Sequence, residues 1–162
     1  MRRIIIFTGI ALILTACGTQ SAGEPSGPGV GTSNNGMMSQ HHAPIPIEYA
    51  GMTNPIPSES DSLERGASLY ATNCASCHGD GGMGDGPAAS ALDPAPAPVA
   101  HSSQMMADDY LFWRISEGGT SLGSSMPAWK TLDEEARWDI INYMRALGTG
   151  DAKPASNMGG EL

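Results

Sequence analysis

The chain has 162 residues, enough for one folded domain with appended segments, and its composition is ordinary for a soluble globular protein. Seventeen acidic residues against eight basic ones give a formal charge of −9. This acidity argues against binding to nucleic acid, whose phosphates repel a negative protein. It fits docking to a basic or neutral partner surface, and equally an acidity that only maintains solubility.

The N-terminus has the pattern of a lipoprotein signal. Two arginines precede an apolar run that is too short to span a bilayer comfortably. The stretch "LTAC", residues 14–17, is similar to a bacterial lipobox, in which the cysteine is lipidated and begins the mature chain. The alternative is an ordinary secretory signal that leaves this cysteine as a free thiol. We predict a signal peptide over residues 1–16 and lipidation at Cys17, which anchors the protein on the periplasmic or outer face of a bacterial membrane.

Two further segments precede the folded domain. Residues 17–44, beginning with the lipidated Cys17, are rich in Gly, Ser, Pro and Asn and predict a flexible linker. The His41-His42 pair inside it is more typical of a solvated linker than of a metal site. Residues 45–60 are apolar and punctuated by proline, so they predict an extended Pro-rich strap. Such a strap packs either on its own domain or on another subunit.

Residues 61–148 are predicted to form an all-α domain of short helices and long loops, without strand-like alternation. Helical patterns occur at residues 61–74, 108–118 and 131–148. Gly66 lies inside the first pattern at a cost of about 1 kcal/mol relative to alanine, so we expect another helix to approach it closely. The last pattern is predicted to stop at Gly148, and residues 149–162 to form a disordered tail. Because loops cannot pack well among themselves, something else must fill the centre of this domain.

The stretch "CASCH", residues 74–78, has the C-x-x-C-H spacing that is the attachment signature of c-type haem. Two thiols about one helical turn apart reach both vinyl groups along one porphyrin edge. We therefore predict one covalent haem c, with Cys74 and Cys77 as thioether links and His78 as an axial ligand. A structural zinc site usually needs four ligands, and no second C-x-x-C or H-x₃-H pair is present. A redox-active dithiol would need a βαβ context that the pattern does not provide.

Residues 61–148 resemble the class I monohaem c-type cytochromes, and the lipobox indicates a lipoprotein type. The resemblance is carried by "GASLYATNCASCH", by the Met-Pro loop "SSMPAW" and by the aromatic C-terminal helix "RWDIINYMRAL". It covers about half of the chain and implies a cytochrome c-like fold around the haem. It also implies that the first helix crosses the last one, with Gly66 and Tyr70 near Trp138 and Tyr143.

Met126 is the predicted sixth ligand of the iron, because a rigid Met-Pro in a glycine-bounded loop suits a thioether and its distance from His78 fits the family layout. The competing candidates are Met83, Met105, Met106, Met144 and His101. The resemblance implies that the carbonyl of Pro87 accepts a hydrogen bond from the proximal imidazole. Trp129 is a candidate to flank the haem or a propionate. Arg114 is a candidate partner of a propionate, although an exposed helix arginine is the commoner case.

These residues predict an electron-transfer protein that performs no bond chemistry. The expected role is single-electron transfer in a respiratory or photosynthetic chain, from a membrane quinol-oxidising complex to a soluble carrier or oxidase. The strap ahead of a lipoprotein cytochrome domain also resembles the monohaem subunit of alternative complex III. Alternatives are a freestanding periplasmic shuttle, a haem-based sensor of small ligands, and a peroxidase-like enzyme. The last requires an open distal side with acid–base groups.

Overall fold

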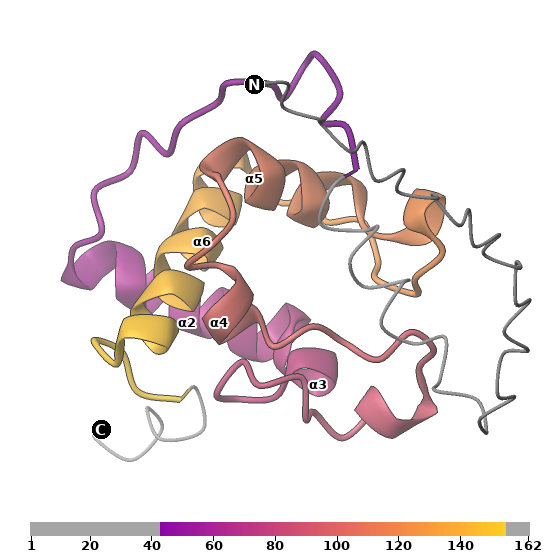
Figure 1. Ribbon diagram of the computed structural model, residues 1–162. Helices are drawn as coiled ribbons and strands as arrows, with labels where there is room; N and C mark the ends of the chain where they lie inside the picture. Colours follow the sequence, from indigo (N-terminus) through magenta and orange to yellow (C-terminus); the bar gives the residue numbers. More distant parts are fainter. Residues whose placement is uncertain (1–42, 155–162) are drawn as a thin grey trace, which may run out of the picture. The chain divides into compact units, whose positions relative to one another are not determined.

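The computed structural model of the protein describes residues 43–154, which fold into helices and loops with no strand among them (Figure 1). The expected all-α class is therefore confirmed. The predicted signal peptide, Cys17 and the linker up to residue 42 lie outside the described residues. The helices are α2 (Ser60–Asn73), α3 (Ala75–His78), the short 3₁₀ helix η1 (Ala89–Ala91), α4 (Val99–Ser102), α5 (Asp108–Glu117), the 3₁₀ helix η2 (Thr120–Leu122) and α6 (Glu134–Thr149).

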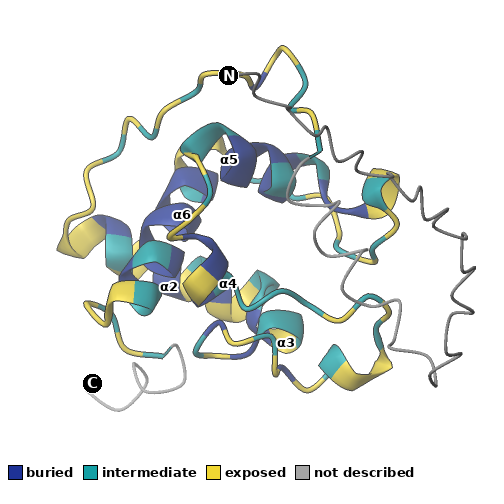
Figure 2. Ribbon diagram, in the orientation of Figure 1, coloured by how far each residue is buried: buried dark blue, intermediate teal, exposed yellow. Residues whose placement is uncertain are grey.

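The core forms where α2 crosses α6 and where α5 packs on α6, and Figure 2 shows that most of α5 and much of α6 are buried. Gly66 lies against the backbone of α6, since a Cβ at this position would come within 2.2 Å of the carbonyl oxygen of Asp139. Four residues further along α2, the buried ring of Tyr70 meets that of Tyr143, with centroids 5.4 Å apart. The predicted close approach at Gly66, and the helix crossing that the resemblance implied, are both confirmed.

Two other helices pack on α6. The ring of Phe112 in α5 stacks on that of Trp138, with centroids 4.1 Å apart and an interplanar angle of 21°. Near the other end of α6, a Cβ at Gly148 would come within 2.0 Å of the carbonyl oxygen of Ala100 in α4. The prediction that Gly148 ends the helix is wrong. The helix ends at Thr149 and is capped by Gly150, which adopts the left-handed conformation (φ +84°), and Gly148 instead permits the contact between helices.

The beginning of the predicted disordered tail, residues 149–154, is ordered. Thr149 belongs to α6, and the amide of Asp151 donates to the carbonyl of Ala146 at 2.9 Å. The hydroxyl of Tyr143 donates to the carbonyl of Lys153 at 2.8 Å. These bonds hold the chain against the helix end, and the sequence pattern gave no sign of them. Residues 155–162 lie outside the described part.

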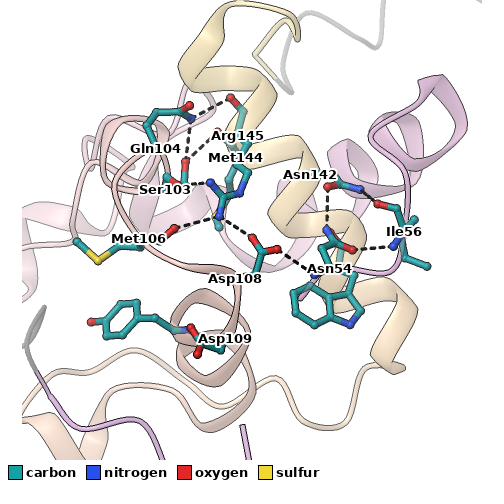
Figure 3. A network of polar contacts seen from close by, with 12 residues as sticks. Asn54, Ile56, Ser103, Gln104, Met106, Asp108, Asp109, Asn142, Met144 and Arg145 are labelled. Carbon is teal, nitrogen blue, oxygen red and sulfur yellow. Dashed lines mark hydrogen bonds and ion pairs between the residues drawn. The ribbon is translucent and has the colours of Figure 1, made fainter. Parts of the chain in front are cut away.

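The strap packs on its own domain and runs without helix or strand up to α2, apart from one turn near Tyr49. Asn54 donates its backbone amide to Asp108 and its side-chain amide to Asn142, at 2.9 and 2.8 Å (Figure 3). The carboxylate of Asp108 also pairs with Arg145 at 2.7 Å. One polar network thus joins the strap to α5 and α6. Of the two arrangements left open by the sequence, the strap adopts packing on its own domain.

Candidate functional site

A cavity of about 350 Å³ lies between α3, the loop of residues 92–97, α5 and the loop that precedes α6. A smaller, more apolar cavity of about 100 Å³ adjoins it. We call them the main and the inner cavity. Both are lined by Cys74, His78, Ala97, Arg114, Met126 and Trp129. The two cavities therefore share a wall and are treated as one site, and most of the residues predicted from sequence lie around it.

The C-x-x-C-H motif forms a single helical turn at the junction of α2 and α3. The amides of Cys77 and His78 both donate to the carbonyl of Cys74, at 3.1 and 2.9 Å. This turn brings both sulfur atoms and the imidazole to the wall of the main cavity, which all three residues line. The two cysteines and the histidine of the motif thus lie side by side at the cavity, as the sequence predicted.

The glycine-rich loop after the motif covers the C-terminal end of α3. Its amides satisfy the free carbonyls of this helix: Gly84 donates to His78 at 2.8 Å and Gly86 to Cys77 at 3.2 Å. A Cβ on Gly86 would come within 2.5 Å of two carbonyl oxygens of α3, so only glycine allows the contact. Because the loop is bound at the helix end, Pro87 is exposed and does not line the cavity.

The imidazole of His78 is held by the backbone of the loop of residues 92–97, where its Nδ1 lies 2.9 Å from the carbonyl oxygen of Ala97. A carbonyl only accepts, so Nδ1 carries the proton and Nε2 is left free for a metal ion. Burial lowers the pKa of His78, which favours the neutral, ligating form. The expectation for Pro87 is wrong, since the loop of residues 92–97 lies beside the ring while Pro87 faces solvent.

The two cysteines do not have the environment of a redox dithiol. Burial raises the pKa of the Cys74 thiol to about 12, whereas redox-active cysteines rely on lowered values. Among the described residues, no three or more His, Cys, Asp and Glu side chains are grouped to hold a metal ion by themselves. The site therefore matches covalent attachment of a group that supplies its own metal better than it matches either a zinc clip or a dithiol.

Met126 is presented by a loop, residues 118–129, that folds back on its own beginning. The amide of Gly119 donates to the carbonyl of Met126 at 2.9 Å, and that of Trp129 to Ile115 at 2.9 Å. Gly118 has φ +71°, and a Cβ there would come within 2.6 Å of the Met126 carbonyl oxygen. The adjacent glycines Gly118 and Gly119 therefore allow the methionine loop to close.

The competing sixth ligands differ in their positions. Met106 and Met144 line only the inner cavity, and Met144 is a buried core residue. Met83, Met105 and His101 are exposed and line neither cavity. Of the candidates, Met126 alone shares both cavities with His78.

Arg114 and Trp129 also lie in the wall of both cavities. The guanidinium of Arg114 donates to the carbonyl of Gly118 at 2.8 Å and lies 5.8 Å from the ring centroid of Trp113. Burial lowers the pKa of Arg114, and it forms none of the ion pairs found in the described part of the chain. A half-buried cation without a carboxylate partner fits an anionic substituent of a bound group.

The donor set of the cavity fits a c-type haem. Paired sulfurs, a neutral imidazole, a thioether and one unpaired cation are the groups that a covalently held haem with propionates requires. Sequence reasoning did not identify the wall formed by Leu92, Pro94, Pro96 and Ala97. The repeated Pro-Ala pattern between two helices was the available signal, but the carbonyl that holds His78 belongs to the backbone and leaves no mark in the side chains.

Comparison with known proteins agrees with this geometry. The family model described as cytochrome C oxidase, cbb3-type, subunit III matches residues 61–144, just over half of the chain. The model of the prokaryotic membrane lipoprotein lipid attachment site matches residues 1–17. None of the curated proteins compared matches the chain. One similar solved structure is a chain of the reducing HAO-like protein complex of Kuenenia stuttgartiensis, at 25% identity and a TM-score of 0.49. The match covers 67% of this chain and 53% of that one, so this chain spans about half of its length.

Proposed function

Because the chain belongs to the family described as cytochrome C oxidase, cbb3-type, subunit III, we propose that it is a membrane-tethered monohaem c-type cytochrome that transfers single electrons. The proposal rests on one observation about the site. His78 and Met126 come from distant segments of the chain, and both line the main and the inner cavity. The proposed direction is from a membrane quinol-oxidising complex to a soluble carrier or oxidase, in a respiratory or photosynthetic chain.

Each site residue has a proposed task. Cys74 and Cys77 would hold one haem c through thioethers, and the chain has only one C-x-x-C-H motif. His78 and Met126 would hold the iron, and the carbonyl of Ala97 would orient the imidazole through the bond at 2.9 Å. When bound, the haem supplies a metal centre that accepts and releases one electron. An iron held by the side chains of both His78 and Met126 would have no position left for a substrate, which favours electron transfer over a sensor or a peroxidase.

The mouth of the main cavity is uncharged. Its exposed lining residues are Thr72, Ser76, Ala95, Ser125 and Pro127. Although the protein is acidic overall, none of its described carboxylates lines the main cavity. We therefore propose that a redox partner docks here through neutral contacts. Electron exchange at this mouth is expected to change less than about twofold when the ionic strength rises through the physiological range.

The proposed location follows from the lipid attachment site. The described part of the chain contains no helix long and apolar enough to cross a membrane. Lipidation at Cys17 would anchor the protein on the periplasmic or outer face. The linker predicted for residues 17–44 would then raise the local concentration of the haem domain near membrane donors to roughly the millimolar range.

The visible spectrum of the oxidised full-length protein, purified in detergent, tests the proposed ligation. We expect the charge-transfer band of a sulfur–iron bond, its loss in Met126→Leu, and its retention in the matched variant Met106→Leu. If Met126→Leu keeps the band, the axial assignment is wrong. Rapid binding of carbon monoxide by the reduced wild-type protein would favour the sensor alternative over electron transfer.

The proposed partner needs a separate experiment. Affinity purification from gently solubilised membranes is expected to recover the protein with a quinol-oxidising complex, of which alternative complex III is one candidate. Recovery of a lone monomer under these conditions would contradict this assignment and favour the freestanding shuttle. The strap does not decide between the two, because Ile45, Met52 and Ile56 pack on the domain itself whereas Ile47 is exposed.

A further inference from the structure

Three side chains meet at the base of the loop of residues 118–129. They are Tyr49 from the strap, Glu117 at the end of α5 and Lys130 just before α6, and we call them the clasp. We propose that Tyr49 is a positioning residue: through the clasp it keeps this loop closed and Met126 directed into the cavity. The inference rests on the proposed role of Met126. It adds Tyr49, a residue that lies outside the predicted haem domain of residues 61–148.

Tyr49 is buried although it belongs to the strap, with 6% of its surface exposed. Its hydroxyl donates to the carboxylate of Glu117. Its ring packs against that of Phe112, with centroids 6.2 Å apart, and lies 5.9 Å from the ammonium of Lys130. Phe112 in turn stacks on Trp138 in the core. Tyr49 therefore connects the base of the loop to the buried aromatic core.

The two charged members of the clasp stand at the two ends of the methionine loop. Glu117 immediately precedes the loop and Lys130 immediately follows it, and their carboxylate and ammonium lie 2.5 Å apart. The ion pair therefore joins the loop ends across 12 residues. Closing a loop at its base removes many of its open conformations, which otherwise compete with the closed one.

The ion pair alone is insufficient for this task. The side chain of Lys130 is 63% exposed and that of Glu117 is 36% exposed, and pairs with such exposure contribute little. The hydroxyl of Tyr49 adds a second, directional bond to the same carboxylate, and networks of this kind are stronger than their separate pairs. The strap thus supplies the least exposed member of the clasp.

Opening of the loop base is expected to propagate to Met126. Inside the loop, the fold depends on a few backbone bonds, chiefly that from Gly119 to Met126 at 2.9 Å and that from Trp129 to Ile115 at 2.9 Å. No other side chain of the strap reaches this loop through a hydrogen bond found in the described residues. Loss of the clasp would therefore raise the fraction of time during which the thioether is away from the cavity.

The test compares Tyr49→Phe with Tyr143→Phe in the full-length haem-loaded protein. Tyr143→Phe is the matched control, because its hydroxyl also makes one bond to the protein, but to Lys153 and away from the cavity. The first measurement is the rate at which exogenous imidazole displaces the methionine and abolishes the sulfur–iron band. We expect an increase of about fivefold in Tyr49→Phe, the effect of one lost hydrogen bond, and no change in Tyr143→Phe.

The second measurement is amide hydrogen exchange over residues 115–130, which does not depend on the identity of the sixth ligand. It is expected to accelerate in Tyr49→Phe and not in the control. Equal changes in both variants, or no change in either, would overturn the inference. If the wild type lacks the band while exchange responds as expected, the ligand assignment fails and the clasp stands as a constraint on the loop only. Lys130→Met, at an exposed position, is expected to move both measurements in the same direction as Tyr49→Phe.

Discussion

The two walls of the cavity are built in opposite ways. The wall with His78 comes from one stretch of chain, in which a helical turn, a glycine-rich loop and the carbonyl of Ala97 are joined by hydrogen bonds of short sequence separation. The wall with Met126 depends on a folded loop, on α5 and on Tyr49 from the strap, 77 residues earlier. The first wall is therefore expected to resist distant substitutions, whereas the second is expected to respond to them.

The largest effect is expected from breaking the first wall. The double variant Cys74→Ser/Cys77→Ser removes both proposed haem links, and the apolar lining of two cavities then loses the group that fills it. We expect no haem on a denaturing gel stained for haem and a loss of most helical signal by circular dichroism. The control Cys17→Ser should keep its haem and leave the membrane fraction. A haem-free double variant with native helicity would contradict the idea that the cofactor completes the core.

The second wall is tested by Gly118→Ala. A Cβ there would meet the Met126 carbonyl oxygen at 2.6 Å and would also force a non-glycine residue into a positive φ. The matched control is Gly123→Ala, which has a similar φ of +74° but nothing within 4 Å. We expect about 1 kcal/mol of strain in the control and a further 1–3 kcal/mol, roughly, from overpacking in Gly118→Ala. Denaturant unfolding measures both, and only Gly118→Ala should weaken the sulfur–iron band.

Among the described residues, Arg114 is the one residue besides His78 that can carry a positive charge into the lining of the main cavity. Removing a half-buried positive charge favours the more positive, oxidised state of the centre, so Arg114→Leu should lower the reduction potential. We expect a decrease of about 60 mV, which is a tenfold change for one electron. Lys153→Gln removes an equal charge at an exposed site and should change the potential by only a few millivolts, since solvent screens it. Equal shifts in redox titration would place Arg114 outside the electrostatic environment of the haem.

The smallest expected effect concerns the clasp and pH. The hydrogen bond from Lys130, followed by that from Tyr49, lowers the pKa of Glu117 below its ordinary value. The stabilisation of the folded state by this carboxylate is therefore present above its unfolded pKa and is lost as the pH falls through the lowered value. Lys130→Met should raise the pKa of Glu117 toward the ordinary range, as measured by NMR titration of the reduced protein. An unchanged pKa would mean that the ion pair does not form in solution.

Much of the first wall could be predicted from sequence because its determinants are local. The C-x-x-C-H spacing places two thiols and an imidazole on one helical turn wherever that turn lies in the fold. Gly66 indicated a helix crossing because a glycine inside a helix is costly without a packing reason. The partner of His78 was not predictable, since any backbone carbonyl serves and only the path of the chain selects Ala97 rather than Pro87.

The roles of the glycines near the helix ends were likewise not predictable from sequence. Gly148 and Gly118 both follow helical patterns and look alike in sequence, yet one lies inside α6 against α4 and the other ends α5 against Met126. Their roles depend on which backbone comes close, which is a property of the assembled fold. The ordered start of the tail, held by Tyr143, has the same origin.

The sequence by itself determined the helical class, the lipid attachment signal and the group that fills the core, because each depends on residues that are neighbours in the chain. Only the tertiary structure decided which methionine shares both cavities with His78 and that the strap turns back to the base of the methionine loop. These contacts join residues far apart in sequence. Such pairings are selected by the packing of the whole domain, and no local pattern specifies them.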